Sequence, residues 1–342
     1  MRMMKEIPVW HDVTAAQFED EIRPLGEPAV LKGLVNDWPI VAFAREGDRP
    51  LIDYLCSIAG PQPVPCVHAE PEIEGRFHYS EDLRRPNFAH AKVPLGNFLA
   101  QLLAEAGRDR PVALAAQGLV VPECLPGFLD RHRLSILPDA IVPRMWIGNA
   151  IKVATHNDPL ENVACVAAGR RRFTVFPPEQ LGNLYIGPFH YTPAGTPVSM
   201  VHVTKPDPER YPRFADALDA AQWAELEPGD AIYLPYQWYH HVESLDAVNV
   251  LVNYWWNPAR QDLGSPWDAM LHAMMSVRNL PREQRRAWRA AFDHYVFLEN
   301  GDPGAHLPDY ARGVMAADSP QDIDQMRQSV IQKLTEDMHK RR

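Results

Sequence analysis

The chain has few of the features that would mark it as a disulfide scaffold, a zinc ribbon or a membrane protein. Its 342 residues include only four cysteines, Cys56, Cys66, Cys124 and Cys165, with no C-x-x-C spacing. Free thiols are typical of a reducing compartment, so we expect a cytoplasmic protein. No apolar run approaches the ~18 residues of a membrane helix, and the N-terminal stretch MRMMKEIPVW lacks the apolar centre of a signal peptide.

An excess of positive charge is also absent. The 44 acidic residues outnumber the 34 basic ones and give a net charge of −10 at pH 7. Domains that bind nucleic acid are usually basic, so we expect neither a nucleic-acid nor a membrane partner. The one basic run is Arg170-Arg171-Arg172. On a strand the middle residue of three faces opposite to its neighbours, which predicts that Arg170 and Arg172 lie at a solvated strand edge.

Long helices that alternate with strands are absent from the middle of the chain. Between residues 112 and 256, short β-prone runs are separated by Gly and Pro turns, for example RMWIG, IKVATHND, RRFTVFPP and VNVLVNYWW. The run Glu227-Pro228-Gly229-Asp230 predicts a tight turn into the strand AIYLP. This pattern disfavours a βαβ sheet and favours an antiparallel barrel or jelly roll.

Helical patterns flank this β-rich stretch. Thr14 before AAQFEDEI predicts a capped helix, and residues 93–107 carry apolar side chains at helical spacing. Helical patterning returns over 265–299 and 319–339, and the second of these begins at Ser319 with Pro at its first turn.

We therefore expect a mainly β protein with helical flanks. The predicted division has three parts: an N-terminal α/β flank over 1–110, an antiparallel jelly-roll (double-stranded β-helix) core over 111–258, and a C-terminal helical region over 259–342.

A candidate metal site stands out in the β-rich stretch. His156 and Asp158 follow the strand IKVAT two residues apart, so their side chains face the same way. His240, 84 residues later, is the candidate third ligand. Two histidines and one carboxylate with open positions suit non-haem Fe(II), whereas zinc more often takes Cys or a third His. An H-x-D motif is common by chance, and the alternative interpretation of His240-His241 is a hydrogen-bonded pair at a strand end.

Several motifs at consistent spacing resemble the cupin-like JmjC family of Fe(II)/2-oxoglutarate oxygenases. They are HND at 156–158, AGRRRFTVFPPEQ at 168–180, LEPGDAIYLPYQWYHHVES at 226–244 and VNYWW at 252–256, together with PAVLKGLVNDWP at 28–39. The resemblance covers most of residues 28–256. It implies an Fe(II)- and 2-oxoglutarate-dependent dioxygenase, a hydroxylase of a protein, a peptide or a small molecule.

The resemblance also assigns roles to individual residues. His156, Asp158 and His240 match the three iron ligands, and His241 would point away from the cavity. Four further residues match positions around 2-oxoglutarate: Arg171, Asn162, Asn253 and Trp255.

Three positions depart from the family pattern. Arg171 stands where relatives carry Lys to bind the distal carboxylate of 2-oxoglutarate, a task that a guanidinium can perform with two hydrogen bonds. Relatives also have a Tyr on an early strand and a Thr or Ser three residues before the first His, where this chain has Ala113 and Val153. Lys152 and Thr155 are possible substitutes.

These departures keep two alternatives open. One is a non-catalytic cupin that binds a metal or ligand, and the other is a metal-dependent cupin enzyme that does not use 2-oxoglutarate. Residues 265–299 carry an apolar helical stripe, and the resemblance implies that helices after the barrel form a homodimer interface; packing on the barrel is the simpler interpretation. The loop from Tyr185 to Tyr211 is expected near the cavity mouth.

Overall fold

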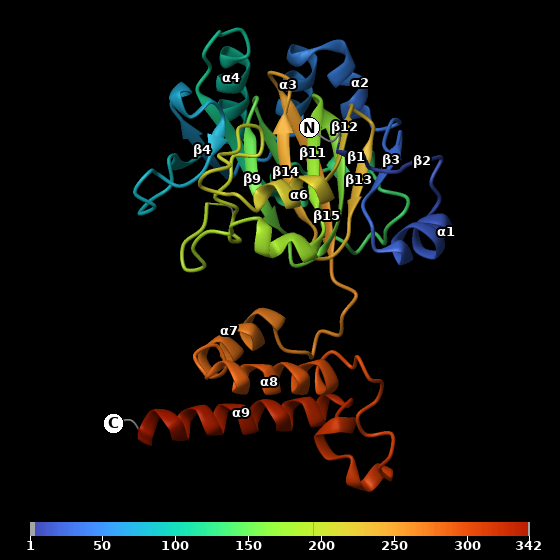
Figure 1. The fold of residues 1–342 in the computed structure, drawn as a ribbon. Helices are drawn as coiled ribbons and strands as arrows, with labels where there is room; N and C mark the ends of the chain where they lie inside the picture. The colour runs from blue at the N-terminus through green and yellow to red at the C-terminus, as the bar shows by residue number, and fades with distance from the viewer. Residues whose placement is uncertain (1–3, 194, 341–342) are drawn as a thin grey trace. The chain divides into compact units, whose positions relative to one another are not determined.

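The structure is a computed structural model that describes residues 4–193 and 195–340. The chain divides into two compact units, one that ends at Asn257 and one that begins at Pro258. The first unit holds both large sheets, and the second is helical (Figure 1). Within the described residues, no helix has the length and apolar character that a bilayer span requires.

Two sheets form the body of the first unit. The smaller has six strands in the order β1-β12-β11-β14-β9-β5, and the larger has nine in the order β2-β3-β13-β10-β15-β8-β7-β4-β6. The strand bounds in the smaller sheet are Lys5–Glu6 (β1), Arg76–Phe77 (β5), Lys152–Asn157 (β9), Arg171–Phe176 (β11), Gln222–Leu226 (β12) and Tyr239–Ser244 (β14). Those in the larger sheet are Val9–His11 (β2), Ala29–Lys32 (β3), Pro63–Ala69 (β4), Ala89–Pro94 (β6), Ala113–Val120 (β7), Arg144–Gly148 (β8), Glu161–Ala168 (β10), Ala231–Leu234 (β13) and Asn249–Trp256 (β15).

The inner faces of the two sheets pack on each other. Phe173 and Val242 of the smaller sheet contribute to one buried cluster with Ala164, Ile232 and Leu251 of the larger sheet. Strands β10 and β13 are buried along their whole length, because the second face of the larger sheet is also covered. The cupin-type double sheet predicted for this part of the chain is confirmed.

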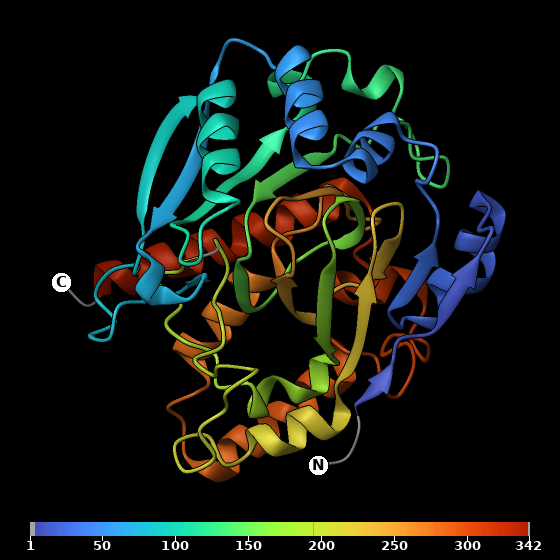
Figure 2. The ribbon, with the colours of Figure 1, turned by 90° about the horizontal axis from the view of Figure 1, so that it is seen from above.

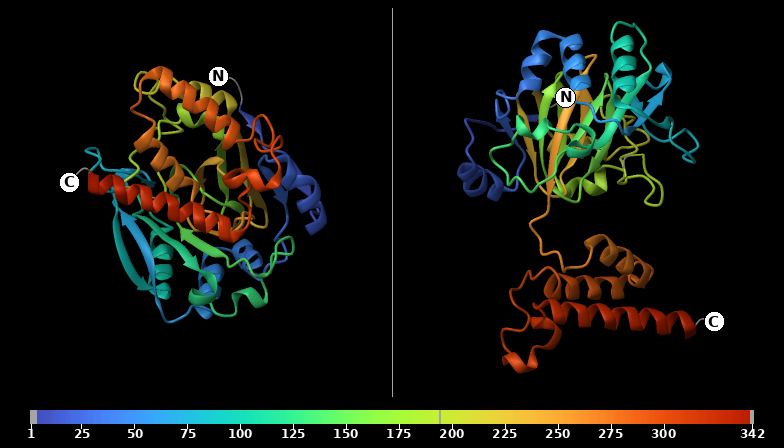
Figure 3. Two further views of the ribbon diagram at one scale, coloured as in Figure 1. Left: turned by 90° about the horizontal axis from the view of Figure 1, so that it is seen from below. Right: turned by 180° about the vertical axis from the view of Figure 1, so that it is seen from behind.

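Helices cover the outer faces of both sheets. Phe98 and Leu99 of α4 and Leu51 of α3 pack with Val163 and Val252 of the larger sheet in one cluster. Figures 2 and 3 show α2, α3 and α4 along this side, while α6 lies over the opposite, smaller sheet. The helix bounds in this unit are Ala15–Gln17 (α1), Pro39–Glu46 (α2), Asp48–Ser57 (α3), Leu95–Glu105 (α4), Val121–Cys124 (α5) and Phe214–Ala220 (α6).

The predicted start of the first helix is present. The Thr14 hydroxyl accepts a hydrogen bond from the Gln17 amide at 3.2 Å, as expected of an N-cap threonine. The helix then continues as a π-helical stretch over Phe18–Ile22. Phe18 and Ile22 are fully buried in the cluster under the larger sheet, which holds this segment in place.

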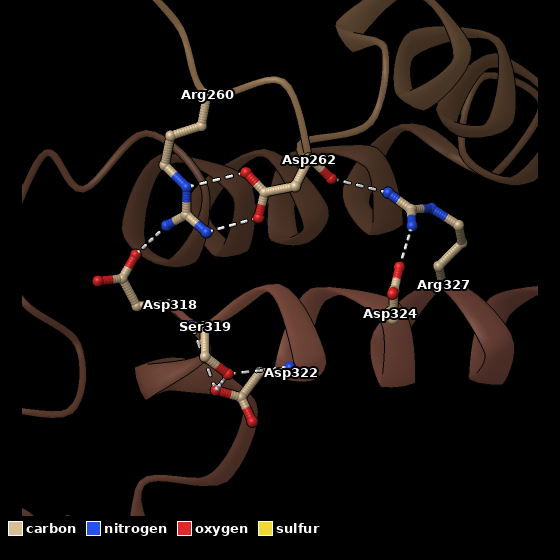
Figure 4. A network of polar contacts seen from close by, with 7 residues as sticks. All are labelled: Arg260, Asp262, Asp318, Ser319, Asp322, Asp324 and Arg327. Carbon is tan, nitrogen blue, oxygen red and sulfur yellow. Dashed lines mark hydrogen bonds and ion pairs between the residues drawn. The ribbon is translucent and has the colours of Figure 1, made fainter.

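The second unit contains α7 (Pro266–Ser276), α8 (Arg282–Tyr295) and α9 (Pro320–Lys340). Ser319 caps α9 as predicted: its hydroxyl accepts from the Asp322 amide at 3.2 Å and donates to the Asp322 carboxylate at 2.6 Å. Figure 4 shows this cap beside two arginines, with Arg260 paired to Asp262 at 2.6 Å and Arg327 donating to the Asp262 carbonyl at 2.8 Å. These contacts join the start of the unit to its last helix.

Candidate metal centre

A cavity of about 670 Å³ opens between the two sheets of the first unit. Strands of both sheets contribute to its wall, so residues that are far apart in the sequence meet there. All seven residues singled out by the sequence line it: His156, Asp158, Asn162, Arg171, His240, Asn253 and Trp255.

The three candidate ligands lie at one end of paired strands. His156 on β9 stands directly opposite His240 on β14, and Asp158 follows the end of β9. The Nε2 atom of His156 is 4.0 Å from Asp158 Oδ1, and the Nε2 atom of His240 is 3.6 Å from Asp158 Oδ2. One ligand atom from each of the three residues lies within 4.8 Å of the other two. The spacing is that of a site for one small cation.

Backbone carbonyls hold both imidazoles in the form that a metal requires. His156 Nδ1 donates to the Ala154 carbonyl at 2.8 Å, and His240 Nδ1 donates to the Trp238 carbonyl at 3.2 Å. The Nε2 lone pair of each ring is therefore free to face Asp158, and such hydrogen bonds fix ligand orientation in metal sites. Burial, and next the neighbouring His156, lowers the pKa of His240 to about 4, so it is neutral at pH 7. Two imidazoles that present Nε2 and one carboxylate fit a divalent metal with open positions on the cavity side.

Arg171 is the second unusual feature of the cavity. Its side chain points inward from β11, and the residue is only 3% exposed. Burial lowers the pKa of Arg171 to about 9, so it still carries its charge at neutral pH. Its Nε has no hydrogen-bond partner, and no carboxylate of the described residues pairs with it. A buried cation without a counter-ion is costly, which indicates that an anionic ligand binds beside it.

The two neighbouring arginines behave as the strand pattern predicts. Arg170 pairs with Asp246 at 2.9 Å and with Glu225 at 3.3 Å, and Arg172 pairs with Glu225 at 3.1 Å. These are ion pairs at the protein surface, and only Arg171 turns toward the cavity.

The three remaining predicted residues lie together on the cavity wall. Asn253 Nδ2 donates to Asn162 Oδ1 at 3.1 Å, while Asn253 Oδ1 is buried without a partner. Trp255 packs edge to face on Trp146 with ring centroids 5.0 Å apart, and its indole N–H is likewise buried without a partner. Both groups leave a polar atom available to a ligand.

A β-bulge decides which side chains near His156 reach the cavity. The register between β9 and β14 shifts by one residue between the His240 and Val242 pairs. Val153 therefore lines the cavity although it lies three residues before His156, whereas Lys152 and Thr155 are not part of the lining. Neither of these two offers the substitute hydrogen bond that the sequence suggested. His241 faces away from the cavity and stands opposite Thr174 on β11.

Several lining residues were not anticipated from the sequence. Ala113 lies outside the cavity, but Ala115 and Gln117 on the same strand line it. Arg144 and Trp146 of β8 alternate toward the cavity, and the run RMWIG could have suggested this. Pro86, Phe88 and His90 add a further wall. The loop after Tyr185 reaches the cavity as expected, through Tyr191, Thr192, Pro193 and Gly195.

Comparison with known proteins places these features in context. A family model described as Cupin-like domain matches residues 15–262. Lysine-specific demethylase 8 of Xenopus tropicalis is 25% identical over 260 residues, which cover 73% of this chain and 53% of that protein. Lysine-specific demethylase JMJ31 of Arabidopsis thaliana is 34% identical over 132 residues, or 38% of this chain and 22% of that protein. tRNA wybutosine-synthesizing protein 5 of Danio rerio is 25% identical over 284 residues, or 73% of this chain and 75% of that protein.

The chain thus spans about half the length, or less, of the first two of these relatives.

Proposed function

The chain belongs to the cupin-like domain family of JmjC type, because the family model spans residues 15–262, and on this premise we propose that it is an Fe(II)- and 2-oxoglutarate-dependent oxygenase. The observation that carries the proposal is the pairing of two features in one cavity. The ligand set of His156, Asp158 and His240 suits Fe(II), and the uncompensated charge of Arg171 requires an anion.

His156, Asp158 and His240 would hold the iron. When bound, Fe(II) supplies the binding position for O2 and the redox chemistry that couples oxidation of 2-oxoglutarate to oxidation of a substrate. The chain's own contribution is to fix three ligands on one side and to leave the cavity side open. The carbonyls of Ala154 and Trp238 accept hydrogen bonds from the two Nδ1 atoms and so orient both Nε2 atoms toward the metal position.

Arg171 would bind the distal carboxylate of 2-oxoglutarate. Its guanidinium can donate two parallel hydrogen bonds, and the apolar surroundings strengthen them. Val153, Phe173 and Val242 line the same cavity, and such apolar side chains would exclude water from the ion pair. Asn162, Asn253 and Trp255 would orient the rest of the co-substrate. The overall reaction converts a C–H bond, O2 and 2-oxoglutarate into C–OH, succinate and CO2.

A succinate assay tests the proposal. Protein supplied with Fe(II), ascorbate and 2-oxoglutarate is expected to release succinate and CO2 slowly even without substrate. His156→Ala and Asp158→Ala should abolish both this release and iron retention, while the exposed control His272→Ala should do neither. Full turnover in either ligand variant would overturn the assignment.

The same assay separates the alternatives. A non-catalytic cupin would retain iron but release no succinate. A cupin enzyme that does not use 2-oxoglutarate would likewise release no succinate from it. The matched relatives are named for demethylation and for tRNA wybutosine synthesis, which favours an enzyme over a binding protein.

We further propose the following for the whole molecule. The substrate is a protein, a peptide or a small molecule, and the net charge of −10 disfavours nucleic acid. Four free cysteines suit the cytoplasm. We propose the same division as from the sequence: a flank over 1–110, a catalytic core over 111–258 and a helical region over 259–342. The helical region would form a homodimer interface.

A further inference from the structure

The cavity is larger than the proposed co-substrate requires. Its volume of about 670 Å³ lies in the middle of the ~300–1,000 Å³ range of pockets that enclose a drug-sized ligand. Beyond the residues assigned to iron and 2-oxoglutarate, part of the wall therefore remains to receive a substrate. This part is formed by Phe88 just before β6, His90 of β6, Gln117 of β7, Arg144 and Trp146 of β8, and Tyr191.

Carboxylates are scarce on this wall. Among the described lining residues, Asp158 is the single acid, and the proposed iron site uses it. The same lining carries two guanidinium groups, Arg144 and Arg171. A cationic substrate group would find no counter-charge beyond the metal site and would face the positive charge of Arg144, since Arg171 is assigned to 2-oxoglutarate. Aromatic faces such as Trp146 could attract a cation, but the guanidinium of Arg144 opposes this attraction.

Arg144 is free to bind a ligand. It is exposed at the start of β8, and its Nη1 donates a hydrogen bond to the Gly118 carbonyl at 3.2 Å. Gly118 has a φ of +63° and lies where the β7–β8 register shifts, so its carbonyl turns out of the strand pairing toward this arginine. Within the described chain, no carboxylate forms an ion pair with Arg144. The bond to Gly118 positions the guanidinium and leaves its charge unmatched.

Arg144 also lies beside the proposed co-substrate wall. It stands directly opposite Asn253 in the pairing of β8 with β15, and Asn253 is bonded to Asn162. The next inward residue of β8 is Trp146, which packs on Trp255. A group held by Arg144 would therefore lie next to the wall that we assign to the co-substrate. Gln117 and the buried, unpartnered Tyr191 hydroxyl add polar contacts on the same lining.

From this arrangement we propose that the substrate presents a carboxylate to Arg144, close to the carbon that is oxidised. This inference rests on the proposed oxygenase function and specifies its substrate class. An aspartate-like or glutamate-like group fits, either in a peptide or in a free carboxylic acid. A methylated lysine does not fit, although relatives of this chain are named for lysine demethylation.

Binding measured without turnover tests the inference. The protein is loaded with Fe(II) and 2-oxoglutarate under argon, and ligand binding is followed by the broadening of ligand proton signals by the iron. The small probes are N-acetyl N-methylamides of aspartate, asparagine and Nε-trimethyl-lysine. Three pools of decapeptides each carry one of these residues at the centre. Comparing the small probes with the peptide pools distinguishes a free carboxylic acid from a peptide as the substrate.

The aspartate probe is expected to bind at least tenfold more tightly than the trimethyl-lysine probe in one format or both. Because a charge-assisted hydrogen bond contributes about 1.5–3 kcal/mol, Arg144→Gln should weaken aspartate binding about tenfold or more. Arg144→Lys should retain much of it, and binding of the asparagine probe should change little. The surface control Arg49→Gln, which is not part of the cavity, should bind like the wild type.

Two results would overturn the inference. One is that the aspartate probe binds no more tightly than the trimethyl-lysine probe in both formats, and the other is unchanged aspartate binding in Arg144→Gln. Each titration begins by recording the absorption of the Fe(II)–2-oxoglutarate complex. If this complex forms, a negative binding result contradicts only the role of Arg144. If it does not form, the proposed oxygenase function itself is contradicted.

Discussion

Arg171 has opposite effects on the empty and the liganded protein. Its charge is buried in a cavity that Val153, Phe173 and Val242 also line, and no carboxylate of the described residues balances it. In the absence of an anion this arrangement costs stability, and with an anion the same burial strengthens the ion pair. Binding affinity and folding stability should therefore respond in opposite directions when the charge is removed.

We predict this reversal for Arg171→Met. The free energy of unfolding without 2-oxoglutarate should be unchanged or higher, while affinity for 2-oxoglutarate should fall about tenfold to a hundredfold, as for the loss of a charge-assisted hydrogen bond. Arg171→Lys keeps the charge, so its affinity for 2-oxoglutarate should lie between those of the wild type and Arg171→Met. Arg170→Met, on the surface, serves as the control. Tight binding of 2-oxoglutarate by Arg171→Met would contradict the assignment.

His132 links stability to pH. It is fully buried, its Nδ1 donates to the Phe128 carbonyl at 2.6 Å, and its Nε2 accepts from the Ile40 amide at 3.1 Å. Burial is the main cause that lowers its pKa from 6.5 to about 4. The unfolded chain therefore binds a proton more readily than the folded chain, and stability is complete above pH 6.5 and falls as the pH drops toward 4.

The corresponding prediction concerns the slope of stability against pH. In metal-free protein, His132→Gln should be less stable at pH 7.5, where its lost packing matters, but should lose less further stability between pH 6.5 and 4.5 than the wild type. Urea unfolding at several pH values measures this, with His272→Gln as the exposed control. Parallel curves for wild type and His132→Gln would refute the linkage.

At the scale of single elements, the bulge in β9 marks a limit of sequence reasoning. Strict alternation correctly pairs His156 with Asp158, because both lie beyond the bulge. The same alternation would put Val153 on the outer face, yet it lines the cavity. An extra residue in one strand leaves no trace in hydrophobic spacing, so the side that Val153 faces could not be derived from the strand pattern.

A buried ion pair joins an early segment to two strands of the larger sheet. Arg23 donates two hydrogen bonds to Glu161 at 2.8 and 2.9 Å, and the Tyr233 hydroxyl donates to the same carboxylate at 2.8 Å. Glu161 begins β10, one residue before Asn162. Sequence spacing does not predict this contact, because Arg23 and Tyr233 are 138 and 72 residues away from Glu161.

Arg23 provides an internal comparison, because it also binds Glu19, which is largely exposed. Glu161→Gln should lower the free energy of unfolding by about 2–3 kcal/mol, since it leaves a partly buried guanidinium underpaired. Glu19→Gln should cost less than about 1 kcal/mol. Denaturant titration of both variants measures the difference, and equal effects would show that burial does not matter here.

On the scale of the whole molecule, the sequence predicted the double sheet and the helical ends because their periodicities differ. The cavity wall was harder to predict. Gln117 and Arg144 face the cavity only because β7 and β8 pair beside β15, and strand order is not encoded in spacing. The candidate iron ligands could be predicted from the sequence, because a short motif carries two of them at one strand end.

The helical unit exposes many apolar side chains, including Leu271 and Met275 one turn apart on α7 and Val330 on α9. Exposed apolar surface of this kind is typical of a protein interface. We predict a dimer at micromolar concentration by light scattering, and a monomer for the double variant Leu271→Glu, Met275→Glu, with Gln284→Glu as the control. A monomeric wild type would rule out the proposed interface.

The central claim is that the ligand triad and Arg171 together form one site for Fe(II) and 2-oxoglutarate. Anaerobic titration of Fe(II)-loaded protein with 2-oxoglutarate tests it most directly, because chelation of the iron by the keto acid produces a visible charge-transfer band. We predict a band that saturates at one equivalent per chain, is lost in Asp158→Ala and needs far more 2-oxoglutarate in Arg171→Met. No band in the iron-loaded wild type, or an undiminished band in Asp158→Ala, would contradict the claim.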